Sequence, residues 1–176
     1  MLGIGNKFPQ FKLIGVTGLD KDTAFKEITN ETYKGKWMVI FFYPKDFTFV
    51  CPTEIAGFNK LNDEFAKKNV QVLGASVDNE FVHLAWKNHH PDLKDLKFPL
   101  LSDLRRDLSA ALGILDPSTG VANRATFVVD PEGTIRFVEM TDMNVGRNPH
   151  ETLRIVDALI EGGLCPCGWK KGEKTL

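Results

Sequence analysis

The feature that most constrains the fold is a run of apolar, aromatic and β-branched residues over Lys36–Tyr43, which stops at Pro44. A half-exposed strand alternates apolar and polar residues, whereas this run is apolar after its first residue. It therefore predicts a strand that is covered on both faces, as in the centre of an α/β sheet. After a short loop, apolar residues recur at helical spacing in Cys51–Lys68, which predicts an amphipathic helix that begins at or next to Cys51.

Strand and helix signals alternate along the rest of the chain. Apolar runs bounded by turn residues predict four more strands, at 70–77, 98–101, 126–130 and 134–140. Helical spacing behind capping residues predicts three more helices. The first begins after Asp78 or Asn79, and the second covers Leu104–Leu112 behind a Ser102–Asp103 cap. The third runs from Asn148–Pro149 to a stop at Gly162–Gly163.

The resulting order of strand, helix, strand, helix, hairpin and helix is thioredoxin-like, and an N-terminal extension precedes it. Strands separated by helices favour right-handed crossovers and a sheet that is parallel in that part. We therefore expect an α/β fold with a central mixed β-sheet flanked by helices. A single domain over 1–163 is expected, followed by a C-terminal tail over 164–176.

Charge and composition exclude several functions. The 176 residues carry a formal net charge of −1 with both signs mixed along the chain, so no basic surface for nucleic acid is expected. The longest apolar run is far shorter than the roughly 20 residues of a membrane-spanning helix, and the first ten residues show no leader pattern. We expect neither a membrane nor a nucleic-acid partner, and a cytoplasmic location.

The three cysteines are unevenly placed, because Cys51 stands alone whereas Cys165 and Cys167 lie together near the C-terminus. So few cysteines argue against a structural disulfide framework, which leaves either chemistry or inert burial. A single cysteine is most often a small buried hydrophobe, so Cys51 taken alone is ambiguous.

The predicted helix start at Cys51 favours chemistry. A cysteine attacks as the thiolate, and an ordinary pKa near 8.5 leaves only a few per cent ionised at neutral pH. The positive end of a helix stabilises a negative sulfur, and a nearby cation would stabilise it further. Arg124 and Lys45 are both candidates for that cation. Thr48 places a hydroxyl one turn before Cys51, although it could also be a simple loop residue or a helix cap.

At these positions the sequence resembles the peroxiredoxin family. The segment PKDFTFVCPTE is similar to the family motif P-x-x-x-T-x-x-C, with Pro44, Thr48 and Cys51 in its fixed places and Glu54 as the acidic residue that follows. The segment that begins at Asn123 resembles the second active-site segment of the family. The likeness covers nearly the whole chain and is strongest to the typical two-cysteine group, in particular to bacterial alkyl hydroperoxide reductase C of the three-cysteine type.

The resemblance implies an enzyme that reduces hydrogen peroxide and organic hydroperoxides, with peroxynitrite as a further candidate, and that serves antioxidant defence. Cys51 would be the peroxidatic cysteine and would become a sulfenic acid. Thr48 and Arg124 would hold the peroxide and stabilise the moving charge, and Pro44 would shield the thiolate from water. Glu54 would orient Arg124, or would act only as a carboxylate near a helix start.

The tail would rescue the sulfenic acid before further oxidation traps it. By resemblance Cys165 is the resolving cysteine, which forms a disulfide with Cys51 of a partner chain, so that a homodimer and a ring of dimers are implied. Cys167 departs from the common pattern and could form a further disulfide, relay electrons or be spare. The segment 91–97 stands where easily overoxidised members carry a Gly-Gly-Leu-Gly insertion, and no Tyr-Phe helix follows, so we expect resistance to overoxidation.

No cofactor is expected, and the external reductant could be thioredoxin, a flavoprotein reductase subunit or an adaptor reductase. A zinc site that combines Cys165 and Cys167 with histidines is disfavoured by their spacing. We expect the histidines, His83, His89, His90 and His150, to be solvated or packed on helices. A thioredoxin-type oxidoreductase would need a second cysteine where Glu54 stands, and a chaperone activity could coexist with the peroxidase.

Overall fold

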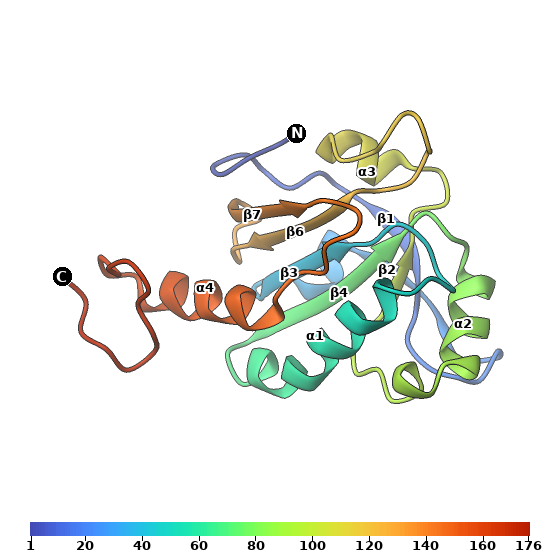
Figure 1. Ribbon diagram of the computed structural model, residues 1–176, viewed down its shortest axis with the longest axis horizontal. Helices are drawn as coiled ribbons and strands as arrows, with labels where there is room; N and C mark the ends of the chain where they lie inside the picture. Colours follow the sequence, from blue (N-terminus) through green and yellow to red (C-terminus); the bar gives the residue numbers. More distant parts are fainter.

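The computed structural model describes residues 1–176 as one seven-stranded mixed sheet with helices on both faces (Figure 1). The strand order is β2-β1-β5-β4-β3-β6-β7, in which β3 runs parallel to β4 and β4 parallel to β5, and the other pairs are antiparallel. The strands are β1 (Lys12–Val16), β2 (Phe25–Thr29), β3 (Trp37–Phe42), β4 (Val70–Ser76), β5 (Leu100–Ser102), β6 (Arg124–Val129) and β7 (Ile135–Thr141). The helices are α1 (Cys51–Ala66), α2 (Glu80–His89), α3 (Asp107–Leu112) and α4 (Pro149–Glu161), with 3₁₀ turns η1 (Asn30–Tyr33) and η2 (Pro91–Leu93).

The central position predicted for the first apolar run is confirmed, because β3 lies between β4 and β6 and its side chains alternate between two cores. Met38, Ile40 and Phe42 join the core on the side of α3 and the N-terminal segment. Val39 and Phe41 join the core formed with α1, α2 and α4. A strand that supplies two cores has no polar face, which explains why the run is apolar throughout.

The N-terminal extension contains two strands that the sequence did not reveal. β1 and β2 form an antiparallel hairpin, and β1 also pairs with β5, so the extension enlarges the sheet on one side. Both strands are short, and β2 is an edge strand with the mixed sequence FKEIT, which is why it carries little apolar periodicity.

One predicted helix was misplaced at its start. α3 begins at Asp107 and not at Leu104, because Arg106 before it adopts a left-handed conformation with φ 63°. The Asp103 carboxylate nevertheless accepts hydrogen bonds from the amides of Leu108 and Ser109, so it caps the helix from five to six residues away. The predicted end holds, since Gly113 closes the helix with φ 72°.

The tail folds back against the end of α4 (Figure 1). Gly162 ends the helix in a left-handed conformation. Beyond it Trp169 is only 1% exposed, and Arg154 of α4 donates a hydrogen bond to its carbonyl oxygen. None of the helices is long and apolar enough to cross a membrane.

Candidate active site around Cys51

The Cys51 side chain is fully buried at the first residue of α1. The apolar core side chains Ile55 and Phe58 fix the helix on the sheet, and Pro52 occupies the first turn, where a missing N–H costs nothing. The positive end of the α1 dipole therefore points at the sulfur. This location is the one that the sequence predicted for the thiol.

Arg124 reaches the sulfur from the first residue of β6. Because β6 runs antiparallel to β3, its first residue lies at the end of β3 where the chain turns toward α1. Nη1 of Arg124 lies 3.3 Å from Cys51 Sγ and 2.6 Å from Glu54 Oε2, and Nε donates to the carbonyl oxygen of Met143 at 2.8 Å. Lys45, the other candidate cation, is exposed. The structure thus brings Arg124, and not Lys45, to the thiol.

Glu54 is also held by a second arginine that sequence reasoning missed. The backbone N–H and Nε of Arg147 donate to Glu54 Oε1 at 2.9 and 2.7 Å, and Nη2 donates to Oε2 at 3.0 Å. Nη1 of Arg147 also donates to the Ala125 carbonyl oxygen at 2.9 Å. Arg147 lies in the loop before α4, where no periodicity marks it. The sequence can predict that an arginine such as Arg147 is buried only when its carboxylate partner, here Glu54, is already known.

Glu54, Arg124 and Arg147 form a buried cluster with surplus positive charge, which we call the arginine cluster. Burial raises the pKa of Glu54. The hydrogen bonds and charge of Arg147, together with the charge of Arg124, lower the pKa by more than burial raises it, so the pKa of Glu54 lies below its ordinary value. Glu54 is therefore ionised at neutral pH. Two guanidinium groups face one carboxylate, so the remaining positive charge is available to a thiolate at Cys51.

The loop before Cys51 carries two further predicted site residues. Pro44 is buried, and Thr48 is partly exposed. The Thr48 hydroxyl donates to the Lys45 carbonyl oxygen at 2.9 Å, so its proton is engaged within the loop while its oxygen lone pairs remain free to accept. The loop contains a left-handed residue, Phe47, with φ 54°.

The tail cysteines lie away from this site. The Cys165 thiol is partly buried, 3.8 Å from the Ala158 carbonyl oxygen, and Cys167 is exposed. All three cysteines are free thiols. The 13 residues of α4 separate the arginine cluster from the tail, which corresponds to about 20 Å along the helix axis. The structure therefore does not bring Cys165 or Cys167 to Cys51 within the chain.

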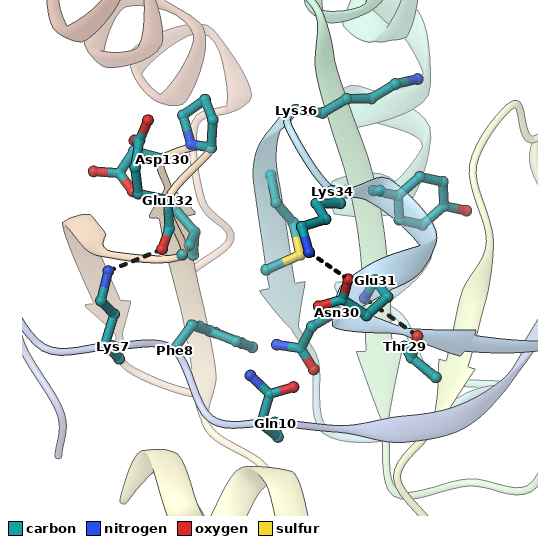
Figure 2. A pocket seen from close by; sticks show the side chains of 15 residues that line it. Lys7, Phe8, Gln10, Thr29, Asn30, Glu31, Lys34, Lys36, Asp130 and Glu132 are labelled. Carbon is teal, nitrogen blue, oxygen red and sulfur yellow. Dashed lines mark hydrogen bonds and ion pairs between the residues drawn. The ribbon is translucent and has the colours of Figure 1, made fainter.

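A hollow of about 230 Å³ opens at the other end of β3 (Figure 2). Two of its three lysines have partners, because Lys7 donates to the Glu132 carbonyl oxygen and Lys34 pairs with Glu31. It contains no cysteine and none of the predicted site residues. The structure also shows no group of three or more His, Cys, Asp or Glu side chains that could hold a metal ion.

Comparison with known proteins agrees with the geometry. Residues 4–138 match the model of the AhpC/TSA family. The chain is 52% identical to alkyl hydroperoxide reductase C of Mycolicibacterium smegmatis over 100% of this chain and 94% of that protein, and 45% identical to peroxiredoxin-2 of Bos taurus over 98% and 88%. Among solved structures, Mycobacterium tuberculosis AhpC superposes with a TM-score of 0.88 at 49% identity over 97% of this chain and 99% of that one. A reduced 2-Cys peroxiredoxin of Plasmodium vivax gives a TM-score of 0.92 at 35% identity over 99% and 93%.

Proposed function

The chain belongs to the AhpC/TSA family of thiol peroxidases, and we propose that it reduces hydrogen peroxide and organic hydroperoxides with Cys51 as the peroxidatic cysteine. One observation carries this assignment. The buried Cys51 sulfur lies at the start of α1 with an arginine nitrogen at 3.3 Å, which is the environment that a reactive thiolate requires.

The first step is nucleophilic displacement at oxygen. The Cys51 thiolate attacks one peroxide oxygen, the S–O bond forms as the O–O bond breaks, and the leaving oxygen takes a proton to become water or an alcohol. Arg124 and Thr48 would hold the two peroxide oxygens and stabilise the charge that moves onto the leaving one. Glu54 and Arg147 would keep the Arg124 guanidinium in place, and buried Pro44 would exclude water.

The second step would use Cys165 of a partner subunit. Its thiol attacks the Cys51 sulfenic acid, forms a disulfide and releases water. The separation of about 20 Å along α4 supports a thiol supplied from another chain, because it keeps the docked tail out of reach of Cys51 of its own chain. A homodimer with two such sites, assembled into a ring of dimers, is the corresponding assembly.

An external dithiol would complete the cycle. Cys167 is exposed two residues beyond Cys165, so it is suited to accept an attack by a reductant after exchange with Cys165. Thioredoxin, a flavoprotein reductase subunit and an adaptor reductase are the candidates, and the cytoplasm is the proposed location.

Mass analysis without reductant tests this function. The wild-type chain and the variants Cys51→Ser, Cys165→Ser and Cys167→Ser are each treated with one equivalent of peroxide. We expect a disulfide-linked dimer in the wild type, no peroxide consumption in Cys51→Ser, and a stable Cys51 sulfenic acid in Cys165→Ser. An unchanged Cys51-linked disulfide in both tail variants would refute the resolving role.

A further inference from the structure

A further carboxylate, Glu139 of β7, lies beside the arginine cluster. In the β6–β7 ladder Glu139 stands opposite Thr126, and residues paired across two strands point to the same face of the sheet. Thr126 is fully buried, and its hydroxyl oxygen accepts a hydrogen bond from Nη1 of Arg147 at 3.3 Å. The Glu139 side chain therefore lies on the face of the sheet to which Arg147 is bound, next to a residue that Arg147 contacts.

The packing of the two strands supports this placement. Phe137, two residues before Glu139, packs against the core formed with α1, α2 and α4. Side chains two residues apart in a strand share a face, so Glu139 lies on the side of these helices. Arg124, two residues before Thr126, points to the same side and reaches Cys51. Glu139, the two arginines and the thiol therefore share one face of the sheet.

The Glu139 carboxylate lacks the hydrogen bonds that Glu54 receives. Glu54 accepts four hydrogen bonds from the two arginines. Oε2 of Glu139 is buried and accepts none. A buried carboxylate oxygen without a donor favours the neutral form of the group. Burial accordingly raises the pKa of Glu139 above its ordinary value of 4.5. Glu139 is thus not a structural partner of Arg147 in the way that Glu54 is.

The charged groups that face Glu139 come from α1, from α4 and from the loop before α4. Beyond the effect of burial, Arg147 lowers the pKa of Glu139, whereas Glu151 of α4 and Glu54 of α1 raise it. Glu151 is bound to Arg154 through two bonds of 2.7 Å, so these two side chains neutralise each other. Arg147 is therefore the cation through which a charge on Glu139 can act.

The ionisation of Glu139 decides the net charge next to Cys51. Arg124 and Arg147 are cations and Glu54 is an anion, so the arginine cluster keeps one positive charge. This surplus stabilises a thiolate as long as Glu139 is protonated. When Glu139 is ionised, the charges of the four side chains cancel, and the thiolate loses part of its stabilisation.

We propose that Glu139 is a positioning residue whose charge acts on Cys51 through Arg147. Protonated Glu139 leaves the arginine cluster its surplus positive charge, and ionised Glu139 cancels that charge and opposes formation of the thiolate. The consequence for peroxide reduction rests on the proposed function, in which Cys51 is the nucleophile. The consequence for the thiolate itself does not, because thiolate formation can be measured without peroxide.

Three variants separate the charge of Glu139 from its shape. Each is made in the full-length chain with Cys165→Ser and Cys167→Ser, so that Cys51 is the only thiol. Glu139→Gln keeps the shape and removes the charge, whereas Glu139→Asp keeps the charge. Glu132→Gln is the matched control, because Glu132 is an exposed carboxylate in the turn of the same hairpin and borders the hollow at the other end of β3.

The reactivity of Cys51 is measured against pH in two ways. Alkylation by iodoacetamide, followed by intact mass, reports the thiolate alone, and stopped-flow consumption of limiting peroxide reports the peroxide step. We expect Glu139→Gln to move the acid midpoint of both profiles down by roughly half a pH unit, a fraction of the shift that a charge in direct contact produces. Glu139→Asp and Glu132→Gln should keep the wild-type midpoint, and the plateau rates should stay within about two-fold of each other.

Urea denaturation gives an independent readout of the charge. Folding raises the pKa of Glu139, so the stability that the protonated group contributes is complete below pH 4.5 and is lost as the pH rises through the raised value. Glu139→Gln cannot ionise, so at neutral pH it should unfold at a higher urea concentration than the wild type, and this advantage should disappear in acid. A carboxylate that holds the fold together, such as Glu54, has the opposite sign.

The proposal is overturned if the alkylation profile of Glu139→Gln coincides with that of the wild type or moves to higher pH. It is also overturned if the rates of this variant fall equally at every pH, which would indicate a structural role. Failure of Glu139→Gln to fold would contradict it too, because removal of a buried charge without a donor should stabilise the protein. If Cys51 is not the peroxidatic cysteine, the background chain will not consume peroxide, and the alkylation profiles still decide the role of Glu139.

Discussion

The two thiol regions of this chain differ in almost every physical property. Cys51 is fully buried, and the Glu54, Arg124 and Arg147 side chains around it satisfy one another through short charged hydrogen bonds. The tail around Cys165 and Cys167 is largely exposed, and few contacts hold it to the body of the protein. Under the proposed mechanism the difference lets one chain meet two demands, because fast attack on peroxide needs a preorganised, buried site, whereas rescue of the product needs a thiol that can travel.

The largest expected effect comes from replacing the thiol of each region in turn and comparing the peroxidase activity of the two variants. Cys51→Ser should lower peroxidase activity to background, since serine at this position is not ionised at neutral pH. Cys165→Ser should instead retain one rapid turnover and then stop. Stopped-flow consumption of peroxide, with and without an added reductant, distinguishes a missing burst from a missing steady state. A normal burst in Cys51→Ser would mean that a tail cysteine, and not Cys51, attacks the peroxide.

Substitution of Arg124 tests whether the buried site needs the planar guanidinium group or only a positive charge. Arg124→Lys keeps a cation but loses the planar fork that touches Cys51, Glu54 and the Met143 carbonyl oxygen together. We expect the peroxide step to slow by roughly 10² to 10³, the range for loss of one preorganised donor in an active site. Arg136→Lys, on half-exposed β7, is the control and should react normally. Equal rates in both variants would show that a nearby charge alone suffices.

Glu54 tests the energetics of the same site. Glu54→Gln leaves two buried guanidinium groups without their carboxylate, so we expect about 3 kcal/mol of lost unfolding free energy, measured by urea denaturation. Glu64→Gln, on the exposed face of α1, should change the midpoint little.

The sign of the pH dependence follows from the Glu54 pKa, which folding lowers from its ordinary value of 4.5. Its stabilising effect is present above pH 4.5 and is lost as the pH falls through the lower value in the folded state. The stability difference between wild type and Glu54→Gln should therefore shrink in acid. A difference that stays constant from pH 7 to about pH 3 would mean that Glu54 acts by shape alone.

The same contrast explains what the sequence could reveal. The β3 run and the helix that follows Cys51 are local patterns of burial and spacing, so the central strand and the start of α1 were predictable. Arg147 was not, because its place beside Glu54 depends on how the loop before α4 packs across 93 residues of sequence. The Asp46 partner of His83 was not predictable for the same reason, since a polar residue that packs on an amphipathic helix shows no sign of which buried group it will meet.

The smallest expected effect concerns how the tail is released. Arg154 binds Glu151 through two bonds of 2.7 Å and donates to the Trp169 carbonyl oxygen at 3.0 Å, which keeps the tail against α4. If Cys165 must leave α4 to reach a partner, Arg154→Met should populate the released tail more and speed disulfide formation by about two- to five-fold. Arg105→Met removes an exposed ion pair far from the tail and serves as the control. Quenched-flow sampling on non-reducing gels gives the rate, and a slower rate in Arg154→Met would mean that the docked tail is itself the form that reacts.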